Sequence, residues 1–430
     1  MAKTVMIGAG SGFGKRLTID LMSYPELRDG TLALVDIDEA ALEGVTAFAR
    51  RVVELHQAPA KVESSTERRQ VLEGADYVMV AISVGGAAYS GEPFYSEVMI
   101  PRKYGVDQSV ADTIGVGGVF RTLRTAPVML DLCRDMEELC PDALLINYTN
   151  PMAMVTWAMY AGSRIRTVGL CHSVQGTAGQ LAGYIGAPRD EVTYWVAGLN
   201  HMSWFLELKW KGEDAYPLLR QALEDPETYA KDRVRFEIMR HFDYFVTESS
   251  THLSEYVPYF RKRPELREQF GLRSREPAQE RRAGRWDWQD PKTRQQLEQI
   301  DLTPSGEYAA HIIHALETNR GFRFNGNVRN EGIISNLPQG CCVEVPCLAD
   351  GSGINPCHVG ALPPQLAALN RANIAVQELT VRAVLERDLH WAYQACLLDP
   401  LTAAVCSLAE IRSMFDELVA AEGDLLRYYS

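Results

Sequence analysis

Strand-like and helix-like segments alternate along the first half of the chain, and this alternation is the feature that most limits its fold. The segment "KTVMIGAGSGFGKRLTIDLM" joins a short apolar run through a glycine-rich turn to residues with helical spacing, and "TLALVDIDEAALEGVTAFARRVVEL" repeats the pattern. Further apolar runs are "ADYVMVAIS", "ALLINYT" and "RTVGLC". Such runs are typical of a parallel sheet with both faces covered by helices. We predict an α/β fold with a doubly wound, Rossmann-type parallel sheet.

The unusual residues of the first half follow directly after these predicted strands. Because crossovers between parallel strands are right-handed, the carboxyl ends of the strands share one edge of the sheet, where ligands bind. The residues at these ends are Gly8 to Gly14, Asp36, Ser83 to Gly86, Asn147 to Asn150, and Cys171 with His172. We therefore expect them to line one crevice.

The first glycine turn predicts a dinucleotide site. Its residues Gly8, Gly10, Ser11 and Gly12 follow a strand and open a helix, although Phe13 stands where the G-x-G-x-x-G fingerprint has its last glycine. Asp36 ends the next strand, where a carboxylate can accept both ribose hydroxyls and repel a 2′-phosphate, which favours NAD over NADP. We also assign Ser83 to the cofactor site. The alternative is a tight turn capped by Ser11.

Size and charge narrow the class of protein. With 430 residues, of which 46% are hydrophobic, the chain is long enough for two domains, which we place at 1–195 and 196–430. The net charge of -13 and the lack of a Lys/Arg tract argue against nucleic acid or an anionic membrane surface as partners. Apolar runs are shorter than the about 20 residues of a membrane span, and the start resembles a strand more than a signal peptide. We expect a cytoplasmic protein whose nine cysteines are reduced thiols.

The second half has a mixed pattern. The segment "EVTYWVAGLNHMSWFLELKW" predicts paired strands, and helical spacing dominates "TPSGEYAAHIIHALETN" and "PPQLAALNRANIAVQELTVRAVLERDLHWAYQAC". We predict an α+β C-terminal domain. The charged segment 275–296 is interpreted as solvated surface, with a mobile loop or an oligomer contact as the alternatives. The cysteines between 341 and 357 match no zinc-site spacing, so we predict no structural zinc there.

Cys171 and His201 form the candidate metal pair. Each lies in a polar turn after a strand-like run, Cys171 in "CHSV" and His201 in "GLNH". A thiolate and an imidazole can hold a divalent cation and leave positions open for substrate and water, which suits Lewis-acid catalysis. The alternative is that Cys171 is a small buried side chain and His201 is hydrogen-bonded in place.

Specific strings along most of the chain resemble the NAD- and manganese-dependent glycoside hydrolases of family 4. After the glycine turn come "DTIGVGGVFRTLRTAPV", "NYTNPMAM", "CHSV", "GLNH", "SEYVPYF" and "NVRNEGIISNLPQGCCVEVPC", in that order. The "CHSV" string is similar to the α-galactosidase (melibiase) branch. Family 4 departs from the usual two-carboxylate mechanism of glycosidases. The resemblance implies NAD and Mn²⁺, or another divalent metal, as cofactors.

The resemblance also implies a reaction course. NAD accepts hydride from C3 of the sugar, the C2 proton is removed, the aglycone leaves, water adds, and the hydride returns. Cys171 and His201 would hold the metal at the sugar oxygens. Tyr256 would be the base, with its pKa lowered by the cation, and Glu255 is its neighbouring rival. His172 would protonate the leaving oxygen or bind a sugar hydroxyl.

Two asparagines complete the implied site. Asn150 would contact sugar hydroxyls or the metal's surroundings, and Asn147 would lie nearer the nicotinamide; either could instead cap a helix beginning at Pro151. The implied substrate is a small α-galactoside such as a disaccharide, and the implied assembly is a homodimer or homotetramer. Alternatives are an α-glucosidase or α-glucuronidase of the same family, an NAD-dependent hydroxy-acid dehydrogenase, and a non-catalytic NAD-binding sensor.

Overall fold

Six parallel strands form the first half of one large sheet. In the computed structural model, which describes residues 2–86, 88–280, 291 and 300–429, they run in the order β3-β2-β1-β4-β5-β6. This is the strand order of the dinucleotide-binding Rossmann fold. The strands are β1 (Lys3–Ile7), β2 (Thr31–Val35), β3 (Lys61–Ser65), β4 (Tyr77–Val80), β5 (Leu144–Asn147) and β6 (Arg166–Gly169). The predicted doubly wound parallel sheet is confirmed.

Alternate residues of these strands enter two separate apolar cores. On one face, Val5 and Val78 pack with Met129 of α5, and on the other, Met6 packs with Leu21 and Phe48 of α1 and α2. Both faces are therefore dry, which explains the unbroken apolar runs in the sequence. The helices of this half are α1 (Gly12–Ser23), α2 (Glu39–Leu55), α3 (Arg69–Leu72), α4 (Phe94–Lys103), α5 (Gly115–Leu139), α6 (Met152–Gly162) and α7 (Ser173–Tyr184), with the short turns η1 (Pro25–Leu27) and η2 (Arg189–Glu191). Of these, α7 packs against β7 (Val192–Leu199) instead, and α4 packs against α5 and α18 (Leu408–Glu422).

The same sheet continues into the second half of the chain. After β6 come β10-β11-β7-β8-β9, with β12 paired to β11, and these strands are antiparallel to their neighbours. Their bounds are β7 (Val192–Leu199), β8 (Met202–Trp210), β9 (Glu213–Asp214), β10 (Phe322–Arg329), β11 (Cys342–Asp350) and β12 (Gly353–Pro356). The predicted pairing within "EVTYWVAGLNHMSWFLELKW" is confirmed as the β7–β8 hairpin. The boundary that we predict at residue 195 falls inside β7, and the division into two domains stays a prediction.

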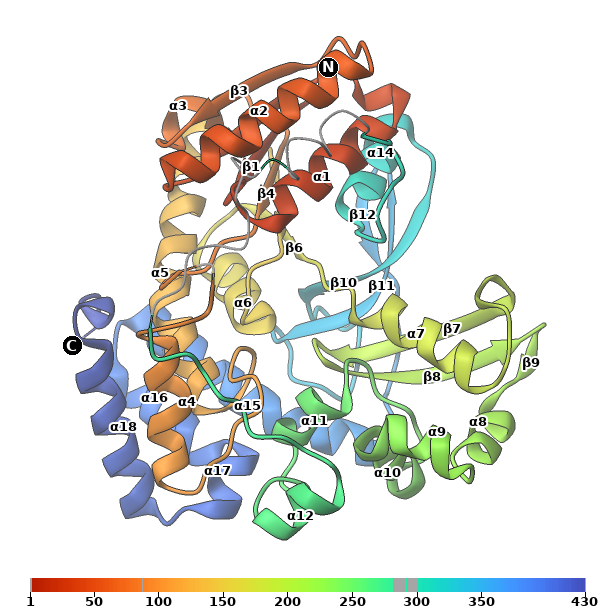
Figure 1. Ribbon diagram of the computed structural model, residues 1–430, viewed down its shortest axis with the longest axis vertical. Coiled ribbons are helices and arrows are strands. Elements are labelled where there is room, and N and C mark those ends of the chain that lie inside the picture. Colours follow the sequence, from red (N-terminus) through yellow and green to blue (C-terminus); the bar gives the residue numbers. More distant parts are fainter. Residues whose placement is uncertain (1, 87, 281–290, 292–299, 430) are drawn as a thin grey trace.

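Helices of the second half gather in two groups. Figure 1 shows α15, α16, α17 and α18 beside α4 and α5 at lower left, and α8, α9 and α10 below the β7–β8 hairpin. The bounds are α8 (Tyr216–Ala222), α9 (Pro226–Lys231), α10 (Arg233–Phe242), α11 (Ser250–Tyr256), α12 (Pro264–Gln269), α14 (Ala309–Thr318), α15 (Pro364–Glu386), α16 (Leu389–Leu398), α17 (Pro400–Val405), α18 (Leu408–Glu422) and η3 (Gly423–Leu426). Most of the predicted surface segment 275–296 lies outside the described residues. Among the described helices, none has the length and apolarity needed to cross a membrane.

Candidate active site

The glycine turn packs too tightly for side chains. Gly8 has φ +79°, and a Cβ there would lie 2.2 Å from the carbonyl oxygen of Ala81. A Cβ on Gly14 would lie 1.8 Å from the carbonyl oxygen of Ala9. Gly14, one residue after Phe13, thus gives the close helix–strand approach that the last glycine of the fingerprint provides. Gly12 is the first residue of α1.

Ser11 and Asp36 lie at the mouth of this turn. The Asp36 carboxylate accepts hydrogen bonds from the backbone N–H of Gly10 at 2.8 Å and of Asp38 at 3.0 Å. Ser11 occupies the N-cap position of α1 but makes no capping hydrogen bond, so the alternative of a Ser11-capped turn is wrong. Its buried hydroxyl finds no partner among the described residues. A buried hydroxyl at a helix N-terminus is available to a phosphate.

Ser83 and Asn147 are engaged within the protein. The Ser83 hydroxyl donates to the carbonyl of Gly86 at 3.0 Å, which closes the loop after β4. Asn147 is fully buried; its amide group donates to the Thr149 carbonyl and to the Thr156 hydroxyl, and its oxygen accepts from the Thr149 N–H at 2.8 Å. Both residues therefore shape the turns beside the crevice, and their contact with a cofactor stays a prediction.

Asn150 precedes a cis peptide bond to Pro151. Helix α6 begins at Met152, and neither asparagine caps it: the N-cap position is Pro151, without a side-chain hydrogen bond. The alternative that Asn147 or Asn150 caps this helix is therefore wrong. The Asn150 amide group instead donates to the carboxylate of Asp112 at 3.3 Å.

Cys171 and His201 meet, as the sequence predicts. Cys171 follows β6, His201 lies at the tip of the β7–β8 hairpin, and the distance from Cys171 Sγ to His201 Nε2 is 3.3 Å. A third group, the carboxylate of Glu248, lies 3.6 Å from the same nitrogen. The ligand atoms of all three residues lie within 4.8 Å of one another. The thiol–imidazole pair has the donors and spacing that a divalent cation needs.

The other side of the His201 ring faces the proposed base. His201 adopts φ +60°, a left-handed conformation that is uncommon for residues other than glycine. Its Nδ1 lies 3.2 Å from the Tyr256 hydroxyl and 3.3 Å from the Thr113 hydroxyl. One imidazole therefore joins the candidate metal cluster to Tyr256, the last residue of α11.

Glu255, the rival base, has a different task. Its buried carboxylate accepts hydrogen bonds from the backbone N–H groups of Ser109 at 2.6 Å, Val110 at 3.2 Å and Ala111 at 3.3 Å. A carboxylate with these partners anchors the loop that leads to Asp112. This arrangement favours Tyr256 over Glu255 as the base.

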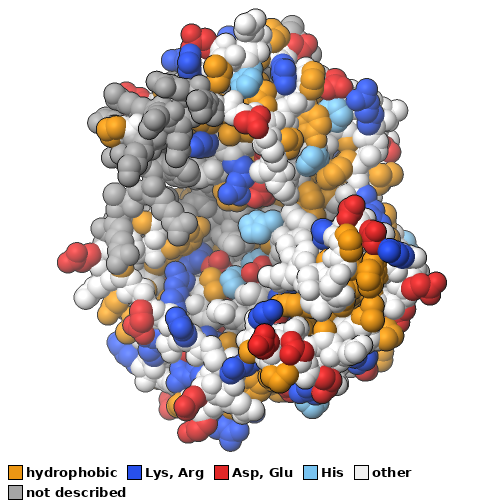
Figure 2. Space-filling model, turned by 45° about the vertical axis from the view of Figure 1, so that its right-hand side comes forward, with side chains coloured by type: hydrophobic (Ala, Val, Ile, Leu, Met, Phe, Trp, Pro, Cys, Tyr) orange, Lys and Arg blue, Asp and Glu red, His pale blue; other side chains and the backbone are white. Residues whose placement is uncertain are grey.

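His172 lies at the entrance of the site. Its side chain is 66% exposed, and Nδ1 is 3.7 Å from the carboxylate of Glu307. Glu307 is buried and also pairs with Arg16 of α1 at 2.9 Å. An exposed imidazole beside a fixed carboxylate can serve either of the two roles expected for His172. Figure 2 shows a hollow on one face in which histidine, acidic and basic side chains lie together.

Burial and neighbouring charges shift the pKa values in the site. Burial raises the pKa of the Cys171 thiol, and the carboxylates of Glu344 and Glu248 raise it further. Burial, Asp112 and Glu255 also hold the pKa of Tyr256 well above its usual value of 10.0. A nearby cation, which we expect to lower the pKa of Tyr256, must overcome these effects. Both groups therefore depend on added positive charge to ionise.

The pKa values of two carboxylates, Glu248 and Asp112, are shifted downward instead. Burial would raise the pKa of Glu248, but His201, His252 and His172 bring it below its ordinary value. Burial likewise opposes ionisation of Asp112, yet His252, Arg121 and His201 lower its pKa. These two carboxylates are therefore favoured in the ionised form, which suits a cation.

The sequence did not predict three of these residues, which are Asp112, Glu248 and Glu307. Asp112 is the first residue of the family string "DTIGVGGVFRTLRTAPV". Its carboxylate in that string was a signal from which the sequence could have predicted it. Glu248 and Glu307 stand outside the recognised strings, and only the folded chain brings them to Cys171 and His172.

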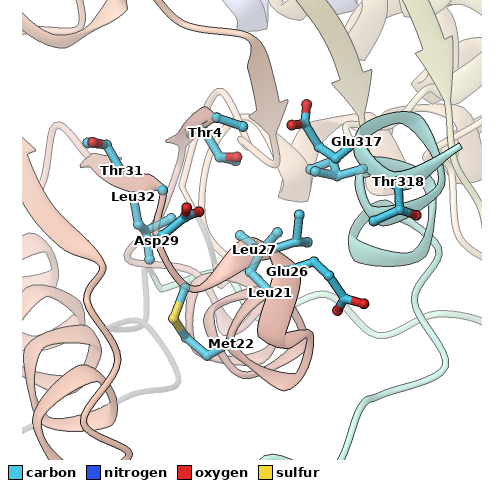
Figure 3. A pocket seen from close by; sticks show the side chains of 13 residues that line it. Thr4, Leu21, Met22, Glu26, Leu27, Asp29, Thr31, Leu32, Glu317 and Thr318 are labelled. Carbon is cyan, nitrogen blue, oxygen red and sulfur yellow. The ribbon is translucent and has the colours of Figure 1, made fainter. Parts of the chain in front are cut away.

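A separate cavity of about 310 Å³ lies at the opposite edge of the sheet. It is lined at the amino ends of β1 and β2 by Thr4 and Thr31, and by residues of α1, η1 and α14 (Figure 3). Ligands of open α/β sheets bind at the carboxyl ends of the strands. This cavity is therefore not part of the candidate active site.

Comparison with protein families identifies the chain. The family 4 glycosyl hydrolase model matches residues 3–187, and the model of the family 4 glycosyl hydrolase C-terminal domain matches residues 196–402. The chain belongs to family 4 of the glycosyl hydrolases. This membership makes it a glycoside hydrolase and confirms the resemblance seen in its strings.

Individual relatives of this family 4 glycoside hydrolase agree over the full length. An alpha-galactosidase of Bacillus subtilis (strain 168) is 43% identical over 436 residues and covers 100% of both chains. An alpha-galactosidase of Rhizobium meliloti (strain 1021) is 37% identical over 448 residues, which are 100% of this chain and 90% of the relative.

Solved structures share the fold of this family 4 member. A Bacillus subtilis protein provisionally described as a glucosidase aligns with a TM-score of 0.82 and 26% identity, over 97% of this chain and 99% of that chain. The 6-phospho-beta glucosidase of Thermotoga maritima, solved with manganese, NAD+ and glucose-6-phosphate, has a TM-score of 0.75 and 24% identity, over 97% and 98% of the two chains.

Proposed function

We propose that this family 4 glycoside hydrolase cleaves α-galactosides, with NAD and Mn²⁺ or another divalent cation as cofactors. The observation that carries the proposal is the joint placement of Cys171, His201 and Tyr256, in which one imidazole is 3.3 Å from the thiol sulfur and 3.2 Å from the phenol oxygen. The full-length similarity to two α-galactosidases supports the choice of sugar.

The residues around the glycine turn fit NAD. The turn offers a close backbone approach at Gly8 and a buried Ser11 hydroxyl that finds no partner in the described parts of the chain, both suited to a pyrophosphate. The Asp36 carboxylate, fixed by Gly10, stands at the end of β2, where it can accept ribose hydroxyls. Ile37 is 94% exposed beside it, and an apolar side chain there can cover an adenine ring.

The donor set of the cluster fits a divalent cation. When bound, NAD accepts and returns the sugar hydride, and the cation polarises the carbonyl group that forms at C3. Cys171 and His201 would hold the cation, with Asp112 and Asn150 nearby to orient sugar hydroxyls. These two residues are joined by a hydrogen bond of 3.3 Å, so they are held as a pair.

Tyr256 would remove the C2 proton, and His201 prepares it for this step. If Nε2 of His201 donates its lone pair to a cation, the ring proton resides on Nδ1. Nδ1–H then donates across 3.2 Å to the Tyr256 oxygen and stabilises the phenolate, which is the basic form. The imidazole thereby offsets the effect of burial on Tyr256.

His172 would face the leaving oxygen at the open side of the site. The Glu307 carboxylate lies 3.7 Å from Nδ1 and can orient the imidazole. The substrate we propose is a small α-galactoside such as a disaccharide. A homodimeric or homotetrameric assembly and a cytoplasmic location stay predictions. That the protein binds neither nucleic acid nor membranes also stays a prediction.

A substrate screen tests this function. Nitrophenyl α-galactoside, α-glucoside and α-glucuronide are compared with Mn²⁺, NAD⁺ and a thiol reductant, each also omitted in turn. We expect release of nitrophenol from the α-galactoside only when all three are present. Preference for another sugar would overturn the galactoside assignment, and net NAD⁺ reduction by hydroxy acids would overturn the glycosidase assignment.

A further inference from the structure

We propose that Glu248 is a third protein ligand of the divalent cation, beside Cys171 and His201. Its carboxylate oxygen lies 3.6 Å from His201 Nε2, and the three ligand atoms lie within 4.8 Å of one another. The inference rests on the proposed function in so far as a cation is required there. It adds a residue that the family strings in the sequence do not contain.

The spacing of the three groups suits joint coordination. Metal bonds of about 2.0–2.3 Å place neighbouring ligand atoms about 3.0–3.6 Å apart. The two distances at His201 Nε2, 3.3 Å to the Cys171 sulfur and 3.6 Å to the Glu248 oxygen, lie in this range. The third pair, the Cys171 sulfur and the Glu248 oxygen, lies within 4.8 Å, so small side-chain rotations could bring all three groups onto one cation.

A buried network fixes the backbone of Glu248. Glu248 adopts φ +73°, a left-handed conformation that costs a residue with a Cβ about 1 kcal/mol or more. Its carbonyl oxygen accepts hydrogen bonds from the Arg235 guanidinium and, at 3.4 Å, from the Thr177 hydroxyl. Arg235 is 2% exposed and is itself held by Asp232 at 2.9 Å and Gln180 at 2.6 Å. The surroundings thus hold Glu248 in a strained conformation that directs its carboxylate toward the cluster.

Charge balance agrees with this assignment. A thiolate and a carboxylate together neutralise a divalent cation, and the neutral imidazole adds no charge. Mixed sulfur, nitrogen and oxygen donors suit first-row divalent metals. With three protein ligands, coordination positions remain open for two sugar oxygens or water.

The competing role for Glu248 is an ion pair with His252. Its second oxygen lies 3.8 Å from His252 Nε2, and the His252 ring stands edge-on to His201 at 5.1 Å. If Glu248 only orients His252, its removal leaves the affinity for the metal unchanged. Metal affinity therefore separates the two roles.

The test measures Mn²⁺ binding to the full-length protein, with NAD present and sugar absent. The electron paramagnetic resonance signal of free Mn²⁺ reports how much of the ion is unbound. We expect Glu248→Gln and Glu248→Ala to weaken binding at least about tenfold, a loss typical of disturbed metal surroundings. Glu307→Gln is the matched control: it removes another buried carboxylate of the same crevice, outside the cluster, and should bind Mn²⁺ like the wild type.

Co²⁺ provides an independent readout. The sulfur-to-cobalt charge-transfer band should persist in Glu248→Gln and disappear in Cys171→Ser, while the visible d–d bands shift in Glu248→Gln. Unchanged NAD affinity and thermal unfolding would show that the variants are folded. Wild-type Mn²⁺ affinity in Glu248→Gln and Glu248→Ala would overturn the third ligand and leave the proposed function intact. A wild-type protein that binds no divalent cation would overturn both.

Discussion

The phenol oxygen of Tyr256 lies 3.2 Å from Nδ1 of His201, whose Nε2 lies 3.3 Å from the sulfur of Cys171. A single ring thus has one nitrogen in the candidate metal cluster and the other on the proposed base. The imidazole and the phenol are both buried: His201 is 4% exposed and Tyr256 is 1% exposed. Occupation of the cluster and ionisation of Tyr256 are therefore coupled through the position of one ring proton.

Replacing the proposed base should separate chemistry from binding. In Tyr256→Phe we expect kcat to fall about 10²–10⁴-fold, the usual contribution of a general base, with NAD and Mn²⁺ affinities close to wild type. The measurement is α-galactoside hydrolysis together with solvent deuterium incorporation at C2 of the sugar. Retained deuterium exchange in Tyr256→Phe would show that another group removes the proton.

The glycine turn allows a paired test of close packing. Gly14→Ala places a Cβ 1.8 Å from the Ala9 carbonyl oxygen, so we expect a loss of about 1–3 kcal/mol in unfolding free energy, typical of overpacking, and weaker NAD binding. The control is Gly176→Ala in α7, where a Cβ meets no described atom within 4 Å. That change should stabilise the helix by up to about 1 kcal/mol. Equal urea denaturation midpoints for the two variants would contradict the packing argument.

Hydrophobic periodicity was sufficient to predict the central sheet. Four of its parallel strands, β1, β2, β4 and β5, are largely apolar runs buried on both faces, so burial leaves a direct trace in the sequence. In β6 only the carboxyl-terminal half is buried. The sixth, β3, has the sequence KVESS and lies at the edge of the sheet, partly exposed. Because an edge strand needs few apolar side chains, the sequence held no signal for it.

Without the family strings, which supplied Tyr256, the site was predictable only where residues follow strands or strand-like runs. Cys171 and the Gly8 turn come directly after β6 and β1, and the parallel sheet alone brings strand ends together. Glu248 reaches the cluster from a loop whose conformation depends on the buried Arg235. Contacts of this kind depend on long-range packing, which no local pattern encodes.

The buried carboxyl of Glu344 should make stability depend on pH. Burial raises its pKa from 4.5 to about 7, so between these values the folded state holds a proton that the unfolded state has lost. The unfolding free energy should therefore fall as pH rises through this window, by at most about 3 kcal/mol. The Ser203 hydroxyl, which donates to this carboxylate at 2.9 Å, moderates the effect.

The measurement is urea denaturation of the chelator-treated wild type and Glu344→Gln at a series of pH values. The difference in unfolding free energy between them should decline from about pH 4.5 to about pH 7 and level off above it. Because both proteins share every other titrating group, this difference isolates Glu344. A difference that stays constant across the window would show that Glu344 keeps an ordinary pKa in the fold.

The thiol of Cys171 should react slowly when the cation is removed. Burial and the nearby carboxylates of Glu344 and Glu248 raise its pKa, and the protonated thiol is a poor nucleophile. In chelator-treated protein at neutral pH, we expect iodoacetamide to modify Cys171 more slowly than Cys357, which is similarly half-buried. Peptide mass spectrometry over time measures both rates in one sample. Faster modification of Cys171 would mean that the site ionises this thiol without a metal, and the cation would then be unnecessary for forming the thiolate.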